Sequence, residues 1–105
     1  MVEQITPEQF TAAPGVEDWK VLDSGEAGTV LRTGSFNKGV DVVVRIGALA
    51  DAANHHPDVD LRYPSVTVRL STHEVGGLTE RDVALAREIS AAAAELGVEA
   101  DPGPA

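Results

Sequence analysis

The residues of this chain best suited to chemistry are its three histidines, His55, His56 and His73, which all lie between positions 55 and 73. Imidazole is the one side chain whose unperturbed pKa, about 6.5, lets it give and take protons near neutral pH. A histidine beside a proline is often a turn or cap residue, and His73 alone could be a solvated surface group. The grouping of all three favours an acid–base site instead.

Other kinds of catalytic site find little support in the sequence. The chain has no cysteine, which excludes disulfides, thiolate metal sites and cysteine nucleophiles. Asp51, Asp58 and Glu74 lie near the histidines and could suggest a metal site, but neither an HExxH motif nor a paired-ligand spacing is present. We therefore expect no metal and no cofactor.

Length and charge limit the partners of the chain. Its 105 residues carry a formal net charge of −9, which argues against binding to nucleic acid or to an anionic membrane. No apolar run approaches the roughly 20 residues that span a bilayer, and residues 1–5 lack the basic and apolar pattern of a signal peptide. We expect one soluble, cytoplasmic domain, small enough to gain from oligomerisation.

The first third of the chain predicts a short helix and then a β-hairpin. Thr6 as the N-cap, Pro7 at the first helical position and Gln9 in a capping box begin the helix, and Pro14-Gly15 ends it. Residues 19–22 and 29–33 have the composition of two strands, joined by a turn over 24–28.

Residues 36–54 give two conflicting signals. Their valines have high strand propensity, whereas Val43, Ile46, Ala50 and Ala53 recur at helical spacing. The segment is also too long for one ordinary strand. We therefore predict a helix that ends just before the first two histidines.

The segment 65–73 alternates with a period of two residues. Val66, Val68 and Leu70 share one face, and the polar residues, including His73, share the other. This alternation predicts a half-buried strand that delivers His73 at its carboxyl end on the polar face.

A second capping box, Thr79 with Asp82, predicts the start of the last helix. Its apolar stripe consists of Val83, Ala86, Ile89, Ala93 and Leu96. Gly97 fits a left-handed helix end, and residues 98–105 are expected to form a loose tail. The order helix, hairpin, helix, strand, helix implies a single α+β domain over residues 1–97, with an antiparallel sheet covered by helices.

Four short runs together resemble the pterin-4a-carbinolamine dehydratases: Asn54-His55-His56-Pro57-Asp58, then Tyr63, then Ser71-Thr72-His73-Glu74, then Gly77-Leu78-Thr79-Glu80-Arg81-Asp82. The similarity runs without a gap from about residue 36 to 89. It implies an α-β-β-α-β-β-α fold, in which helices pack on one face of a four-stranded antiparallel sheet. Residues 59–63 would then form a third strand that the alternation alone does not predict.

The resemblance also implies an activity, the loss of water from a 4a-hydroxytetrahydropterin to give the quinonoid dihydropterin. The catalytic group would be His55, His56, His73 and Asp82, with His55 and His73 as the acid–base pair in an undetermined order and His56 holding the substrate. Asp82 is equally well explained as a helix cap. The remaining positions implied to contact the pterin are Asn54, Ser71, Thr72 and Glu74.

Two further expectations come from the resemblance. Members assemble into homodimers or homotetramers through the sheet edge and helices, so we expect an oligomer here. Some relatives act without catalysis as dimerisation or assembly factors, which is the alternative function for this chain. The three histidines favour the enzyme, because a scaffold has no need of several titratable groups in one pocket.

Overall fold

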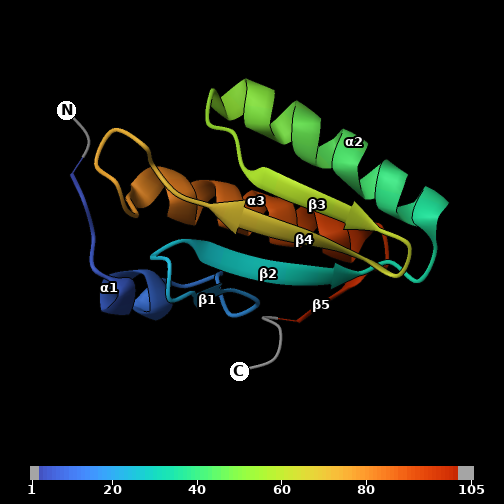
Figure 1. The fold of residues 1–105 in the computed structure, drawn as a ribbon, viewed down its shortest axis with the longest axis horizontal. Helices are drawn as coiled ribbons and strands as arrows, with labels where there is room; N and C mark the ends of the chain where they lie inside the picture. The colour runs from blue at the N-terminus through green and yellow to red at the C-terminus, as the bar shows by residue number, and fades with distance from the viewer. Residues whose placement is uncertain (1–2, 102–105) are drawn as a thin grey trace.

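The computed structural model describes residues 3–101, which fold into helices packed on a five-stranded antiparallel sheet (Figure 1). The strands follow the order β1-β2-β4-β3, and β5 pairs with β2 beside β1. The α+β class and the helix-covered antiparallel sheet predicted from the sequence are confirmed, but the sheet has five strands where the resemblance implied four, because Glu99–Asp101 pair with β2. The elements are α1 (Pro7–Ala12), β1 (Lys20–Val21), β2 (Ala27–Arg32), α2 (Phe36–Ala53), β3 (Asp58–Arg62), β4 (Ser65–Leu70), α3 (Glu80–Glu95) and β5 (Glu99–Asp101).

The capping box predicted for α1 is present. The Thr6 hydroxyl accepts a hydrogen bond from the Gln9 backbone at 3.0 Å, and the Gln9 side chain accepts one from the Thr6 backbone at 2.7 Å. Phe10, on the inner side of this short helix, is fully buried. The second strand of the following hairpin starts earlier than predicted, since β2 begins at Ala27, inside the expected turn. The turn is tighter than expected because the Leu22 backbone N–H donates a hydrogen bond to the Glu26 carbonyl.

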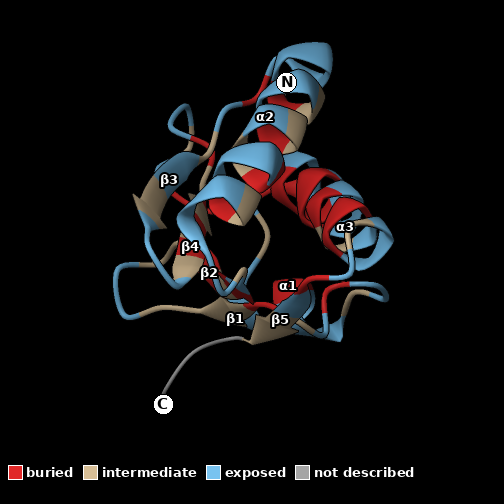
Figure 2. Cartoon of the chain, turned by 90° about the vertical axis from the view of Figure 1, so that its right-hand side faces the viewer, coloured by how far each residue is buried: buried red, intermediate tan, exposed pale blue. Residues whose placement is uncertain are grey.

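The conflict over residues 36–54 is settled in favour of the helix. α2 starts at an N-cap serine, Ser35, and buries a stripe made of Gly39, Val42, Ile46 and Ala50. The buried face of α2 is rotated about the helix axis relative to the predicted face, since Val43 is only half-buried and Ala53 is exposed. Figure 2 shows the buried faces of α2 and α3 turned toward each other and toward the sheet.

The strands β3 and β4 form a hairpin in which Asp58 pairs with Arg69 and Arg62 with Ser65. β4 shows the predicted alternation, since Val66, Val68 and Leu70 are all fully buried. It ends at Leu70, however, so His73 lies in the loop after the strand and not on the strand itself.

The chain after α3 differs from the predicted tail. Gly97 does adopt the left-handed conformation, with φ of 72°, but the next residues form β5, in which Ala100 pairs with Leu31 of β2. An ion pair of 2.6 Å between Arg32 and Asp101 secures the strand and raises the pKa of Arg32 through their hydrogen bond. The loose tail is therefore wrong for Glu99–Asp101, and its remainder, 102–105, lies outside the described residues.

One continuous core joins the elements. Its largest fully buried side chains include Phe10, Leu31, Leu70, Leu85 and Ile89. None of the helices in residues 3–101 has the length and apolar character needed to cross a membrane.

Candidate active site

The end of α2 places the first two histidines. Asn54 caps the helix in a left-handed conformation (φ 50°, ψ 42°), and its backbone N–H and that of His55 both bond to the carbonyl of Ala50. Asparagine is one of the few residues with a side chain that visits this region readily. The resulting turn directs the chain away from the helix axis, so that His55 faces inward and His56 remains exposed.

The loop after β4 supplies the second half of the site. The Thr72 backbone N–H bonds to the Gly77 carbonyl at 2.7 Å, which closes the loop, and Gly76 adopts a positive φ of 64° inside it. His73 and Glu74 therefore lie on a short, closed loop, both exposed. The imidazole of His73 makes no hydrogen bond to any residue between 3 and 101, so both of its nitrogens are open to a ligand.

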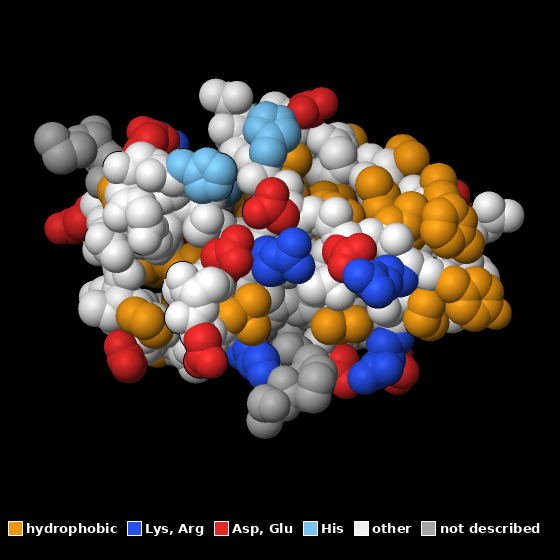
Figure 3. All heavy atoms as spheres, viewed as in Figure 1, with side chains coloured by type: hydrophobic (Ala, Val, Ile, Leu, Met, Phe, Trp, Pro, Cys, Tyr) orange, Lys and Arg blue, Asp and Glu red, His pale blue; other side chains and the backbone are white. Residues whose placement is uncertain are grey.

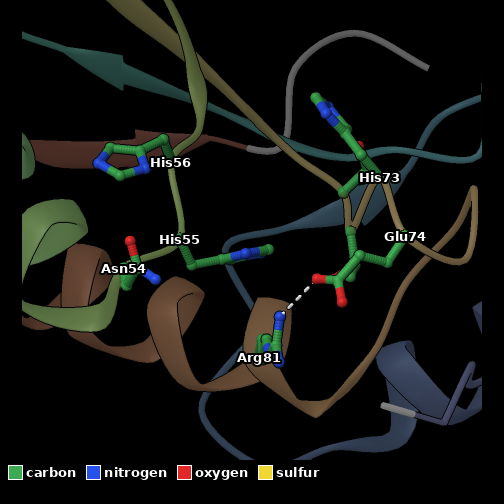
Figure 4. A pocket seen from close by; sticks show the side chains of 8 residues that line it. Asn54, His55, His56, His73, Glu74 and Arg81 are labelled. Carbon is green, nitrogen blue, oxygen red and sulfur yellow. Dashed lines mark hydrogen bonds and ion pairs between the residues drawn. The ribbon is translucent and has the colours of Figure 1, made fainter. Parts of the chain in front are cut away.

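The two segments meet at a pocket of about 230 Å³ (Figure 4). In Figure 4, His55 extends toward the middle of the pocket, while the rings of His56 and His73 lie at its two sides. The pocket thus brings together the seven positions that the resemblance assigned to substrate binding, and adds Arg81. Its lining residues are Asn54, His55, His56, Ser71, Thr72, His73, Glu74 and Arg81.

Asp82 lies behind the pocket and holds His55. Its Oδ1 atom is 2.7 Å from Nε2 of His55, and its Oδ2 atom accepts hydrogen bonds from the Thr72 hydroxyl at 2.8 Å and the Thr79 backbone at 2.9 Å. The Asp82 side chain is fully buried and that of His55 is 9% exposed. A carboxylate that is ionised can only accept hydrogen bonds, so with Asp82 ionised this contact requires the proton on Nε2 of His55 and leaves Nδ1 as the nitrogen that can accept one.

Asp82 caps a helix and also contacts a pocket histidine. Its carboxylate closes the capping box of α3, as the spacing from Thr79 predicted, and the same group orients a pocket histidine. A cap alone would be equally well served by an exposed residue, whereas this carboxylate lies among buried hydroxyls. The hydroxyls of Thr72 and Thr79 lie 2.8 Å apart, which extends the network across the loop.

Two side chains near the pocket carry contacts that sequence reasoning did not anticipate. Asp51, in the last turn of α2, bonds to Nε2 of His56 at 2.9 Å, although both side chains are largely exposed. Arg81, in the first turn of α3, donates a hydrogen bond of 2.8 Å to Glu74. A cation in the first turn of a helix interacts unfavourably with the helix dipole. The position of Arg81 is therefore a sequence signal that could have identified it as a candidate site residue.

The acidic residues around the histidines do not gather into a metal centre. Within the described part of the chain, no three histidine or carboxylate side chains are placed so that they could share a metal ion. The carboxylates instead bond to the pocket's own cationic and imidazole groups, as Asp82, Asp51 and Glu74 do.

Comparison with known proteins gives the same family that the motifs suggested. The profile described as pterin 4 alpha carbinolamine dehydratase matches residues 3–92. Proteins provisionally named pterin-4-alpha-carbinolamine dehydratase include one from Mycobacterium tuberculosis, 42% identical over 92 residues and covering 83% of this chain and 93% of its own. One from Chloroflexus aggregans is 43% identical over 72 residues, 69% of this chain and 77% of its own.

A solved structure shares the fold as well. The crystal structure of a transcriptional coactivator/pterin dehydratase from Brucella melitensis superposes with a TM-score of 0.80 and 25% identity, covering 87% of this chain and 99% of its own. The residues matched by the family profile, 3–92, include every residue that lines the pocket, from Asn54 to Arg81, and Asp82 behind it. The chain therefore belongs to the pterin 4 alpha carbinolamine dehydratase family.

Proposed function

We propose that this chain removes water from 4a-hydroxytetrahydropterins by histidine acid–base catalysis, in the recycling of a pterin cofactor. The observation that carries the proposal is the convergence of three imidazoles on one pocket, one of them held by a buried carboxylate. Family membership supports a dehydratase. At about 230 Å³ the pocket is small beside the roughly 300–1,000 Å³ typical of drug-sized ligands, as suits a two-ring heterocycle.

The reaction requires two proton transfers. A base takes the proton from N5 of the pterin, the N5 electron pair forms the C4a–N5 double bond, and the 4a-hydroxyl leaves as water after it receives a proton from an acid. The pocket offers a group for each step. His55 is the better base, because Asp82 fixes the proton on Nε2, leaves Nδ1 free and stabilises the imidazolium that forms. His73 is the acid, and His56 holds the substrate.

Stopped-flow measurement of dehydration tests this proposal directly. Chemically generated 4a-hydroxytetrahydropterin dehydrates slowly by itself, and the protein should accelerate the appearance of quinonoid dihydropterin in proportion to its concentration. A His55→Ala, His73→Ala double variant is the control for acceleration by other groups. Absence of acceleration by the wild-type protein would reject the enzymatic role and leave the non-catalytic assembly or dimerisation role as the alternative.

The non-catalytic assembly or dimerisation role is kept as the alternative function because apolar side chains lie exposed along one side of the molecule. Val44 and Tyr63 are each 68% exposed, and Phe36 on α2 is 48% exposed. Figure 3 shows a group of hydrophobic side chains at one end of the face it draws. Contiguous apolar surface of this kind is typical of protein–protein contact sites.

We propose that this surface joins copies of the chain into a homodimer or homotetramer. β3 is an edge strand, paired only with β4, and an open edge readily pairs with another strand. In antiparallel pairing of two β3 strands centred on Leu61, Asp60 would lie opposite Arg62 of the second copy, and Val59 would lie opposite its Tyr63, the turn residue that follows β3. The charge and apolar patterns of β3 are therefore self-complementary.

A further inference from the structure

Arg81 occupies a position that stability alone does not explain. It is in the first turn of α3, where the helix dipole disfavours a cation. Its ion pair with Glu74 is exposed, with 46% of the Arg81 side chain and 67% of the Glu74 side chain accessible, and exposed pairs contribute little to folding. What distinguishes Arg81 is that it lines the pocket.

The Glu74–Arg81 pair leaves hydrogen-bonding capacity toward the pocket. Only Oε1 of Glu74 is bonded among the described residues, and Arg81 uses only Nη1 in that contact. A carboxylate has two accepting oxygens, and a guanidinium has five N–H donors in a fixed plane. The pair therefore presents an accepting oxygen beside a donating nitrogen at one wall. Figure 4 shows this pair on the opposite side of His55 from His56.

We infer that Arg81 and Glu74 together recognise the amino-oxo edge of the pterin ring, an inference that rests on the proposed function. This edge presents donors at the 2-amino group and N3, and an acceptor at the neighbouring C4 carbonyl oxygen. Glu74 accepts from the 2-amino and N3 groups, and Arg81 donates to the carbonyl oxygen. The pairing is specific because the ring edge offers donors that suit a carboxylate and an acceptor that suits a guanidinium.

Recognition of this edge also orients the reacting atoms. C4 is bonded directly to C4a, and its carbonyl oxygen lies on the same side of the ring system as N5. An arginine that holds the carbonyl oxygen thus fixes the end of the ring at which the proton transfers occur. Arg81 acts in this way as a positioning and specificity-determining residue, while the histidines move the protons.

Binding of three pteridines, followed by their fluorescence, tests the inference without turnover. Pterin carries the full edge, lumazine replaces the 2-amino donor with a carbonyl, and 2,4-diaminopteridine replaces the carbonyl acceptor with an amino group. The wild-type protein should bind pterin about tenfold or more tightly than either analogue, because lumazine sets a carbonyl oxygen against the carboxylate and 2,4-diaminopteridine sets an amino group against the guanidinium. Arg81→Gln should lose the discrimination against 2,4-diaminopteridine, and Glu74→Gln that against lumazine.

Two controls separate recognition from a general structural effect. Arg81→Lys keeps the charge and should restore part of the discrimination, whereas Arg45→Gln removes an arginine from a similarly exposed ion pair with Glu95 and should change nothing. If wild-type protein binds none of the three pteridines and does not accelerate dehydration, the proposed function itself fails. If it binds pterin but Arg81→Gln keeps the wild-type affinity and discrimination, only the role of Arg81 is overturned.

Discussion

At the scale of single residues, Asp82 serves two parts of the molecule with one carboxylate. It caps α3 through the Thr79 backbone and holds His55 through Nε2. Since it is fully buried, removal of the carboxylate would leave Nε2 of His55 and the Thr79 backbone N–H without this acceptor, while the Thr72 hydroxyl would keep its bond to the Thr79 hydroxyl. Substitutions at this position therefore separate the structural role from the chemical one.

Asp82→Asn should preserve the fold and impair catalysis. The amide oxygen can still accept from Thr79 and Thr72, but the amide nitrogen must donate to Nε2 of His55, which shifts the imidazole proton to Nδ1 and blocks the base. We expect kcat to fall by about 10²-fold at near wild-type stability. Asp82→Ala should instead cost about 2–4 kcal/mol of unfolding free energy. Urea titrations measure the unfolding free energy of both variants, and stopped-flow assays measure their kcat. A wild-type kcat in the Asp82→Asn variant would show that Asp82 acts only as a helix cap.

The histidines should differ in the kinetic constant that they affect. His55→Ala and His73→Ala each remove a proton-transfer group and should lower kcat by roughly 10²-fold or more, whereas His56→Ala should mainly raise KM. Because His55 is buried, His55→Gln is the matched control: it keeps a donor for Asp82 but cannot accept a proton. Steady-state kinetics of the four variants would contradict the assignment if the His55 and His73 variants both kept the wild-type kcat.

The residue types that form the pocket could be predicted from the sequence, and their mutual contacts could not. The histidines and their polar neighbours were identifiable by motif, because the motif fixes residue type and spacing. The His55–Asp82 bond joins positions from different elements, and no local pattern encodes that distance. Arg81 stood within one of the runs that carry the resemblance but was given no role, because the capping box next to it accounted for the local sequence.

At the scale of elements, the end of α2 decides where His55 lies. Asn54 is the only residue other than glycine with a positive φ among residues 3–101, and it also lines the pocket. The backbone and the amide of this residue can therefore be tested separately.

Asn54→Gly should keep the turn and remove the amide, while Asn54→Ala should strain the turn. We expect the alanine variant to lose about 1 kcal/mol of stability, a decrease in Tm of roughly 4–8 °C for a domain of this size, and the glycine variant to lose much less. Both should raise KM if the amide binds substrate. Thermal unfolding by circular dichroism and KM measurements distinguish the two effects, and equal Tm values for the two variants would show that the left-handed turn imposes no strain.

The elements predicted correctly are those with strong periodicity or caps. The capped helices α1 and α3 and the alternating strand β4 each satisfied at least one of these criteria, and length resolved the ambiguity of α2. β3 was expected only from the family resemblance, because Val59 and Leu61 are too few to establish an alternation. β5 was missed because its three residues pair through backbone groups, and Glu99 and Asp101 give no apolar signal.

At the scale of the whole molecule, the proposed oligomer can be tested through the β3 edge. The free chain should sediment as a multiple of 11.0 kDa at micromolar concentration. Val59→Lys with Tyr63→Lys places like charges opposite each other across the edge and should shift the population to monomer. Thr11→Lys, on α1, is the control and should leave the mass unchanged. A monomeric wild-type protein would reject the assembly.

The bond between His55 and Asp82 has a consequence for how the protein loses activity under denaturing conditions. It joins the residue after α2 to the first turn of α3, and Thr72 extends the network to the end of β4. His55, the proposed base, therefore keeps its position only while three elements are docked on one core, at the end of the molecule where α2 ends and α3 begins (Figure 1). Turnover should then disappear over the same range of urea concentration as the helical signal, so that residual activity reports the globally folded fraction.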